Sequence, residues 1–273
     1  MNEVLDLMKR HRSRRRFSAG DLPRSVLHEC VDAARHASTS SLLQTYSVIV
    51  VRDEERKRVV YELCSEQEMI LEAPCFLAIC VDLHRIEAAC EVAGGKAGLA
   101  DLETLVLGCA DASLLGQNLM LALESQGYGG CFVGAARNHP VELARVLQLP
   151  PRVFVVFGMV AGVPVDEPLP RPRMPLEAIL HDEVYDDART SQGLATMDER
   201  QRDWARRTNT EKGGHAGRLV NTDRGWCARV RHRMDAERPP APRDRLRSQL
   251  ETLGFCLDPD GPDQVPADTD EAG

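Results

Sequence analysis

A cluster of cations near the N-terminus is the first candidate for binding chemistry. The stretch KRHRSRRRF, residues 9–17, carries six permanent cations together with a histidine, a serine and a phenylalanine. Arginine forks bind phosphate and carboxylate groups in bidentate fashion. We interpret the cluster as a candidate wall of an anion pocket. The alternatives are a solvated surface and a targeting signal.

Two later stretches offer related chemistry. Residues 38–41 (STSS) form a hydroxyl-rich loop, and Arg171-Pro172-Arg173 holds two guanidinium groups on a backbone that proline restricts. Separate cationic stretches and a hydroxyl loop suit a phosphorylated, polyhydroxylated, planar ligand. Each stretch alone is equally compatible with an exposed surface loop.

The overall charge limits the classes of partner. The 273 residues carry a formal net charge of −8, with 43% hydrophobic and 28% charged residues. A protein that coats nucleic acid normally carries the opposite sign. A basic N-terminus and an Arg-rich segment at 200–234 leave nucleic-acid binding as an alternative, but the acidic total predicts none. The local cations therefore favour a specific anion.

Several common catalytic motifs are missing from the sequence. It contains no GxxxxGK[ST], GxSxG or HExxH, and GYGGCFVG does not fit GxGxxG because Phe132 stands in the place of the third glycine. A zinc set could be imagined from Cys75, Cys80, His84 and Cys90. We expect no metal site, because Cys75 and Cys80 lie in an apolar strand that favours burial. Nine scattered cysteines without CxxC, and no signal-peptide pattern, predict a reducing cytoplasm.

The elements that must position these residues alternate along the chain. Apolar periodicity predicts helices near 2–10, 22–36, 53–66, 101–126, 140–147 and 240–252, and strands near 46–53, 74–82, 131–133 and 153–162. The pattern favours an α/β or α+β fold with one central sheet. The apolar run 102–123 approaches the length of a membrane span, but Asp111 interrupts it. We expect a buried helix and no membrane.

The C-terminal third has a different composition. Residues 164–175 are proline-rich and extended, and apolar periodicity weakens beyond about residue 190. We predict a core over 1–190, a C-terminal extension over 191–257 and an acidic, disordered tail over 258–273.

The order of these motifs resembles the nitroreductase superfamily, and within it the oxygen-insensitive, NADPH-dependent nitroreductase and flavin reductase branch. The resemblance rests on HRSRRRF, STSSLLQ, GYGGCFVGAARN, VFVVFGMVAGVP and RPRMP in this order. It covers residues 1–190 and continues more loosely through 206–212 and 237–255. It implies an α+β fold with a central mixed sheet surrounded by helices, a long central helix and a C-terminal extension.

The resemblance also implies a site for flavin mononucleotide (FMN). Its residues would be His11, Arg12, Ser13, Arg14, Arg15, Thr39, Gln67, Phe132, Val133, Gly134, Ala135, Arg171, Pro172 and Arg173. Arg15 would lie beside the pyrimidine edge, Arg171 and Arg173 would hold the phosphate, and a backbone N–H of Gly134 or Ala135 would face N5. Ala135 departs from a family pattern that has a second glycine, so a positive φ there would cost stability.

A basic segment after the core is the expected site for the 2′-phosphate of NADPH. The resemblance places this contact on Arg207 and Lys212. Lys212 departs from the expected arginine and offers a point charge in place of a planar fork. The alternative is a solvated basic loop.

A stripe of small residues on the long helix suggests close packing. Gly108, Ala112 and Gly116 recur every four residues. The stripe could pack within the chain, but the resemblance implies that this helix forms the core of a homodimer.

The function implied by the resemblance is that of an FMN-dependent NADPH oxidoreductase working by a ping-pong cycle. Hydride would pass from the nicotinamide to the flavin and then to a nitroaromatic, a quinone or free flavin. Because the cofactor carries the chemistry, we name no side chain as catalytic acid or base. The alternative is a flavin-binding sensor or assembly protein without reductase turnover.

Overall fold

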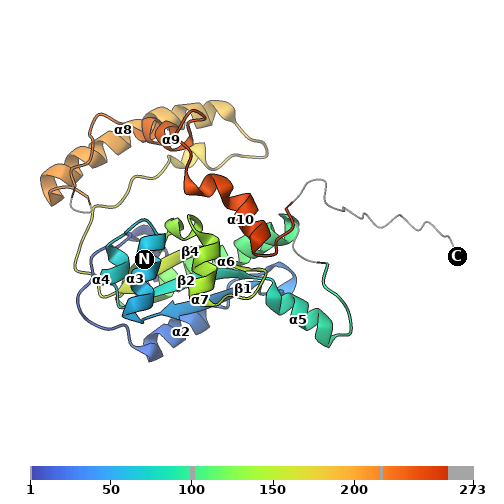
Figure 1. The fold of residues 1–273 in the computed structure, drawn as a ribbon. Coiled ribbons are helices and arrows are strands. Elements are labelled where there is room, and N and C mark those ends of the chain that lie inside the picture. Colours follow the sequence, from blue (N-terminus) through green and yellow to red (C-terminus); the bar gives the residue numbers. More distant parts are fainter. Residues whose placement is uncertain (1, 99–101, 216–217, 258–273) are drawn as a thin grey trace, which may run out of the picture.

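A four-stranded sheet forms the centre of the protein (Figure 1). The computed structural model describes residues 2–98, 102–215 and 218–257. The strands are β1 (Tyr46–Val51), β2 (Cys75–Asp82), β3 (Gly129–Val133) and β4 (Val153–Gly162), in the order β1-β2-β4-β3. All three pairings are antiparallel, whereas the resemblance implies a mixed sheet. The strands β2 and β3 point the same way, but β4 separates them, so no parallel pair forms among the described residues.

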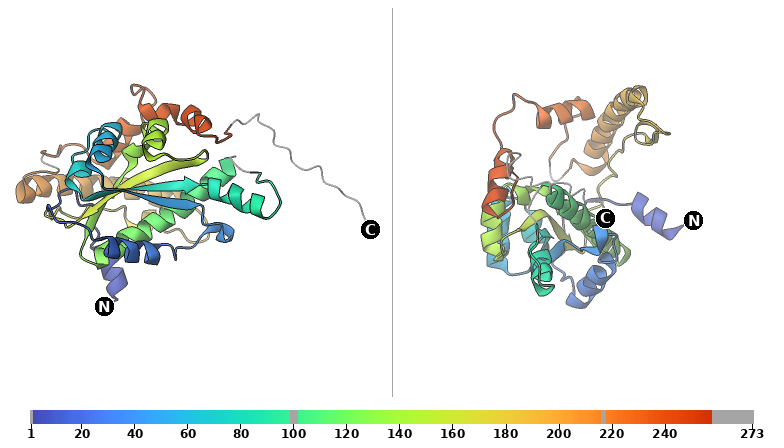
Figure 2. Two further views of the ribbon diagram at one scale, coloured as in Figure 1. Left: turned by 60° about the horizontal axis from the view of Figure 1, so that its bottom comes forward. Right: turned by 90° about the vertical axis from the view of Figure 1, so that its right-hand side faces the viewer.

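One face of the sheet packs against two helices. Helix α2 (Arg24–Ala34) and the long helix α6 (Leu102–Ser125) share a hydrophobic cluster with Leu77 and Ile79 of β2. Side chains two residues apart on a strand point to the same face, so alternate residues of β2 build this layer. Figure 2 shows α2 and α6 together on one side of the sheet.

The opposite face packs against three shorter helices. Phe76 and Ala78 of β2 join the cluster that contains residues of α3 (Glu54–Leu63), α4 (Met69–Glu72) and α7 (Pro140–Leu147). All eight residues of β2 are buried, because helices cover both of its faces. The α+β class with a central sheet and a long helix is confirmed.

Helix α6 is long and apolar enough to cross a membrane when judged by length and composition alone. Nine of its residues are buried, and it packs against α2 and β2 as a core helix does. Asp111, which interrupts its apolar run, is itself buried at 2% exposure and accepts hydrogen bonds from Ser40 and Thr45.

The small-residue stripe of α6 faces the sheet of its own chain. A Cβ atom at Gly108 would lie 2.7 Å from Val81, and one at Gly116 would lie 2.8 Å from Phe157. Ala112, between them, is fully buried. The prediction that this stripe makes the dimer contact is therefore wrong, because the sheet already occupies the space that the small residues leave.

Most elements predicted for residues 2–162 are confirmed. Helix α1 spans Glu3–Lys9, while α7 and β4 have the bounds predicted for them. Two helices were not predicted, namely α4 and α5 (His84–Val92). Short 3₁₀ turns occupy Ser40–Leu42 (η1), Gly134–Arg137 (η2) and Leu176–Ala178 (η3).

The C-terminal extension folds over the core and returns to it (Figure 1). It comprises α8 (Asp187–Lys212), α9 (Trp226–Met234), the turn η4 (Pro242–Arg245) and α10 (Leu246–Thr252). Its last helix joins the core cluster of α2 and α6, and Phe255 packs edge to face on Phe154 at 5.7 Å. The predicted helix near 240–252 is confirmed. Helices α8 and α9 were not predicted, and the acidic tail at 258–273 lies outside the described residues.

Candidate active site

Backbone hydrogen bonds place the basic N-terminal segment beside the sheet. The N–H of Arg14 donates to the carbonyl of Gly130 at 2.8 Å, which ties the segment to β3. The N–H of Ser18 donates to Val163 at 2.9 Å, and the N–H of Val165 donates to Arg16 at 3.1 Å. The segment therefore runs along residues 163–165, which lead into the proline-rich loop.

A glycine permits this close approach. A Cβ atom at Gly129 would lie 2.5 Å from Cγ of Arg14 and 3.3 Å from Pro164. Any larger side chain at this position would push the basic segment away from β3. The glycines of QGYGG therefore help to set the distance between the basic segment and the sheet.

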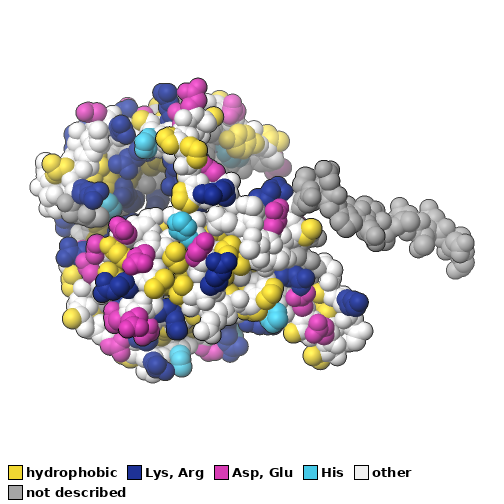
Figure 3. Space-filling view, viewed as in Figure 1, with side chains coloured by type: hydrophobic (Ala, Val, Ile, Leu, Met, Phe, Trp, Pro, Cys, Tyr) yellow, Lys and Arg dark blue, Asp and Glu magenta, His cyan; other side chains and the backbone are white. Residues whose placement is uncertain are grey.

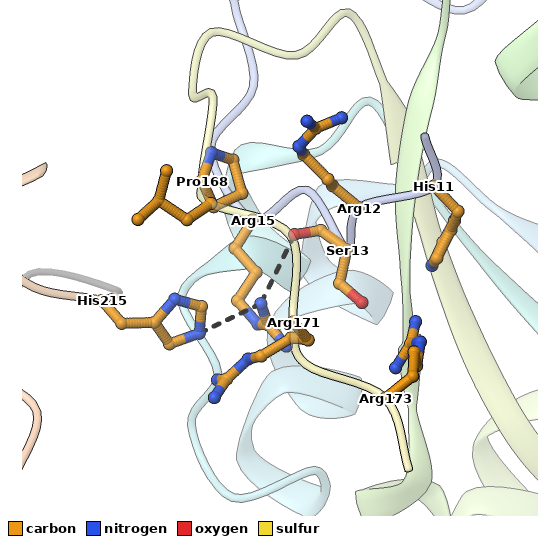
Figure 4. A pocket seen from close by; sticks show the side chains of 9 residues that line it. His11, Arg12, Ser13, Arg15, Pro168, Arg171, Arg173 and His215 are labelled. Carbon is orange, nitrogen blue, oxygen red and sulfur yellow. Dashed lines mark hydrogen bonds between the residues drawn. The ribbon is translucent and has the colours of Figure 1, made fainter. Parts of the chain in front are cut away.

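The segment and the loop enclose a cavity of about 60 Å³. Its lining residues are His11, Arg12, Ser13, Arg15, Pro168, Leu169, Arg171, Arg173 and His215. Figure 4 shows the side chains of Arg15, Arg171 and His215 converging in the cavity, with that of Arg12 directed away from them. The structure thus brings together six of the predicted FMN residues, from two stretches about 160 positions apart in the sequence.

The cavity places arginines close to one another in a half-buried setting. The guanidinium of Arg171 lies over the ring of Trp204, with 3.9 Å from Cζ to the ring centroid. Burial, reinforced by neighbouring cations such as Arg15, lowers the pKa of Arg171 to about 10. Nε2 of His215 lies 3.3 Å from Nη1 of Arg15. Burial and the nearby arginines lower the pKa of His215 to about 4, so its imidazole is neutral at pH 7.

These cations lack anionic partners in the described part of the chain. No ion pair found there involves Arg15, Arg171 or Arg173. Nε atoms of Arg12 and Arg229 are buried without any hydrogen-bond acceptor among the described residues. Buried donors and charges without partners are costly, so this arrangement favours a bound anion.

His11 is fixed by the long helix. Its Nδ1 lies 2.7 Å from Oε1 of Glu124, near the end of α6. Both side chains are largely buried, with 21% and 11% exposure. The contact anchors the start of the cavity wall to the core.

Apart from the turn at the end of β3, four predicted residues do not line the cavity: Arg14, Thr39, Gln67 and Pro172. Arg14 lines a second cavity of about 290 Å³ near the end of α6, and its guanidinium donates to the carbonyl of Asp166. Gln67 donates to the carbonyl of Cys64 at 2.9 Å, and Thr39 precedes η1. Neither Gln67 nor Thr39 lines the cavity.

The predicted N5 turn lies at the end of β3. The ring of Phe132 packs edge to face on Phe157 at 5.2 Å, and Val133 and Ala135 are buried. Ala135 is not among the residues with positive φ, so the expected strain from alanine does not arise. Gly134 also has no positive φ, and a Cβ atom there would meet only ordinary van der Waals contacts, at 3.6 Å or more.

The residues expected to contact NADPH lie on the surface of α8. Nε of Arg207 donates to Glu211 at 2.9 Å, and the Arg207 side chain is 57% exposed. Lys212 is exposed at the last position of the helix. Neither residue lines the cavity.

The extension contributes residues that sequence reasoning missed. His215 closes the cavity, and Trp204 packs against both Arg171 and, at 5.6 Å between ring centroids, His215. Trp204 was one of only two tryptophans in the chain, which is the sole sequence signal that could have drawn attention to it. Arg229 adds a further cation near Arg171 and His215.

No metal centre accompanies the cavity in the described residues, where no three His, Cys, Asp or Glu side chains gather as ligands. Cys75 and Cys80, considered above for zinc, belong to different core clusters on opposite faces of the sheet.

Comparison with known proteins agrees with this geometry. Residues 8–163 match the family described as "Nitroreductase family", and residues 171–258 match its C-terminal domain. The chain belongs to the nitroreductase family. The second match contains the part of the chain that supplies His215 and Trp204, so this part of the cavity also comes from a recognised domain of the family.

Three family members illustrate the similarity. "FMN reductase [NAD(P)H]" of Bacillus subtilis is 36% identical over 187 residues, covering 68% of this chain and 75% of that protein. "Oxygen-insensitive NADPH nitroreductase" of Salmonella typhimurium is 34% identical over 185 residues, covering 68% and 75%. The structure of B. megaterium NfrA2 is 29% identical and aligns with a TM-score of 0.85, covering 94% of this chain and all of that one.

Proposed function

We propose that this protein is an NADPH-dependent oxidoreductase that uses FMN to reduce nitroaromatics, quinones or free flavin in a ping-pong cycle. Its family and the names of its relatives support an NAD(P)H-dependent flavin oxidoreductase. They equally support FMN as the cofactor and NADPH as the donor. The choice among acceptors rests on the family resemblance.

The observation that carries the proposal is the cationic cavity without an internal counter-ion. Its volume of about 60 Å³ is far smaller than that of a pocket that encloses a whole cofactor, so it would hold only part of FMN. The buried Nε of Arg12, a residue that lines the cavity, has no acceptor among the described residues. The donor set therefore fits anionic groups of FMN, while most of the cofactor would lie outside the cavity.

The chain's own residues would bind and orient the cofactor. Arg171 and Arg173 would hold the phosphate, while Arg15 would stabilise negative charge at the pyrimidine edge. Trp204 would keep the Arg171 guanidinium in place through its ring contact. When bound, FMN supplies the hydride-transfer chemistry. No side chain is required as acid or base.

Flavin retention tests this assignment. Replacing Arg171 and Arg173 together by alanine removes contacts worth on the order of 1.5–3 kcal/mol each. The purified double variant should be folded yet largely colourless, as measured by absorbance and circular dichroism. Replacement of two exposed arginines that do not line the cavity, Arg35→Ala with Arg231→Ala, is the matched control. Unchanged FMN affinity in the double variant would disprove the phosphate assignment.

The same preparation separates the reductase from a flavin-binding sensor. NADPH added without oxygen should bleach the yellow protein, and a nitroaromatic should restore the colour. Yellow protein that resists bleaching would favour the sensor. This alternative has some support, because Arg207 is paired with Glu211 and does not face the cavity.

We propose Arg207 and Lys212 as contacts for the 2′-phosphate of NADPH. Both are exposed cations at the end of α8, only a few residues before His215 of the cavity. Arg207→Ala should raise KM for NADPH about tenfold, equivalent to ~1.4 kcal/mol, and leave NADH kinetics nearly unchanged. Arg206→Ala, an exposed neighbour, is the control. Equal kcat/KM for the two nicotinamides in the parent would contradict a 2′-phosphate contact.

A further inference from the structure

A second group of arginines converges beside Gly134, outside the cavity described above. A Cβ atom at Gly134 would lie 3.6 Å from Nη2 of Arg137 and 3.8 Å from Nη2 of Arg243. Arg137 belongs to η2 of the core, whereas Arg243 belongs to η4 of the C-terminal extension. Two guanidinium groups from different domains therefore face the same side of one turn.

Each of these arginines uses only one guanidinium nitrogen in hydrogen bonds to neighbouring groups. Nε of Arg243 donates to Oδ1 of Asn138 at 2.8 Å, and Nδ2 of Asn138 donates to Ser65 at 2.7 Å. Nη1 of Arg137 donates to the carbonyl of Val156. Both Nη groups of Arg243, and Nη2 of Arg137, have no acceptor among the described residues. They lie toward Gly134, the position that offers no side chain to block them.

The charges of this group are not balanced within the described chain. No ion pair there involves Arg137, Arg233 or Arg243. The pKa of Arg243 is lowered, mainly by burial and to a lesser extent by the nearby cations Arg137 and Arg233. By contrast, Arg238 in the same segment forms a close pair with Asp244. A carboxylate is thus available nearby, yet it does not neutralise Arg243.

A purely structural role explains only part of this arrangement. The bond from Arg243 to Asn138 would fasten the extension to the core, but it uses Nε and leaves the remaining fork unpaired. Figure 3 shows Lys and Arg side chains around the hollow between extension and core. A fork held at one end and open at the other is the usual geometry for binding a planar or tetrahedral anion.

We propose that Arg137 and Arg243 bind an anionic group, carboxylate or phosphate, of the electron acceptor. The site lies beside Gly134, in the turn assigned to the flavin ring, so the inference rests on the proposed function. Acceptors with such a group would be favoured over neutral acceptors of the same shape. The phosphates of the dinucleotide donor share this chemistry, but we have assigned one of them to α8.

Matched acceptors test the site. The acceptor 4-nitrobenzoate carries a carboxylate where 4-nitrobenzamide carries a neutral amide. Arg243→Gln should lower kcat/KM at least tenfold for nitrobenzoate and less than twofold for nitrobenzamide and for NADPH. Arg245→Gln, the same charge change at an exposed position of η4, should alter none of the three. Arg243 is preferred to Arg137 because Arg137 is bonded to the core strand β4.

Other outcomes would overturn the proposal. Equal loss with both acceptors would mean that Arg243 only fastens the extension, and a selective rise in KM for NADPH would assign the anion to the donor. Binding of benzoate to the FMN-loaded protein, measured by calorimetry, should disappear in Arg243→Gln and persist in Arg245→Gln. Failure of the parent to turn over the nitro compounds, a quinone and free flavin with NADPH would refute the proposed function, while benzoate binding would still decide the site.

Discussion

The arginines of the cavity differ from other arginines of this protein in the partners they have. On the outer surface Arg35 pairs with Asp32 at 2.7 Å and Arg207 with Glu211 at 2.9 Å, both ordinary exposed contacts of small energetic value. Arg15 and Arg171 instead lie against a neutral histidine and a tryptophan ring. Their unpaired state is more informative about function than their number.

Sequence alone placed six of the cavity residues but not the histidine that closes it. The basic segment and Arg171-Pro172-Arg173 are recognisable because several cations stand close together in the chain. His215 stands 200 positions after Arg15, and a lone histidine carries no such local signal. Its role depends on how the extension folds over the core, which local patterns do not encode.

His215 should make the stability of the apoprotein depend on pH. Its folded-state pKa of about 4 lies below the ordinary value of 6.5, so the unfolded chain binds more protons between these values. The neutral ring therefore makes its full contribution to the free energy of unfolding above about pH 6.5, and this contribution falls as the pH drops toward 4. His215→Gln should flatten the slope of melting temperature against pH in this window, whereas His28→Gln, at an exposed position of α2, should not. An unchanged slope in His215→Gln would show that the ring protonates freely in the folded protein.

At the scale of elements, the hydroxyl loop shows what sequence patterns can and cannot predict. Its composition correctly indicated a loop, but not the strained backbone that it adopts. Ser41, Leu42 and Gln44 all have positive φ, between 48° and 59°. Such conformations are costly for residues other than glycine and persist where surrounding contacts enforce them. Here the enforcing contacts come from a residue 66 or more positions away.

Asp111 is the group that holds this loop. Its carboxylate accepts from the N–H of Ser40 at 3.0 Å, and from the N–H and Oγ1 of Thr45 at 3.2 and 2.9 Å. Asp111→Ala would leave buried donors unsatisfied, so we expect a loss on the order of 3 kcal/mol in the free energy of unfolding. Urea denaturation measures it, with Ser113→Ala on the exposed side of α6 as the control. A loss below about 0.5 kcal/mol would mean that the loop holds its conformation without Asp111.

Helix α8 is an element that the sequence pattern did not predict. Only six of its 26 residues are buried, so the apolar periodicity that identified α7 is weak along most of its length. Its stability derives from an N-cap at Asp186 and from contacts with η3 and α9. The N-cap is a local feature, but the contacts with η3 and α9 are tertiary, so sequence periodicity identified α2, α6, α7 and α10 but missed α8 and α9.

At the scale of the whole molecule, α1 and α6 both present exposed apolar side chains. Helix α1 projects from the body of the chain and buries none of its residues, as Figure 2 shows. Leu5 is 52% exposed, while Val106 and Leu114 of α6 are 56% and 48% exposed. A seven-residue helix is marginal by itself in water, so packing against another surface would explain its stability. This surface, and not the buried small-residue stripe, is where we place the homodimer contact.

We therefore expect the protein to be a homodimer that the double substitution Leu5→Arg, Leu114→Arg dissociates. Two cations in an apolar contact would lose hydration without gaining partners, which strongly opposes association. Sedimentation velocity should give the parent a mass near twice 30.2 kDa and the variant a mass near 30.2 kDa. Val92→Arg, at a side chain 90% exposed on α5, should remain dimeric and controls for a general effect of added charge. An active monomeric parent would exclude the dimer, whereas a dimeric double variant would move the contact away from α1 and the outer face of α6.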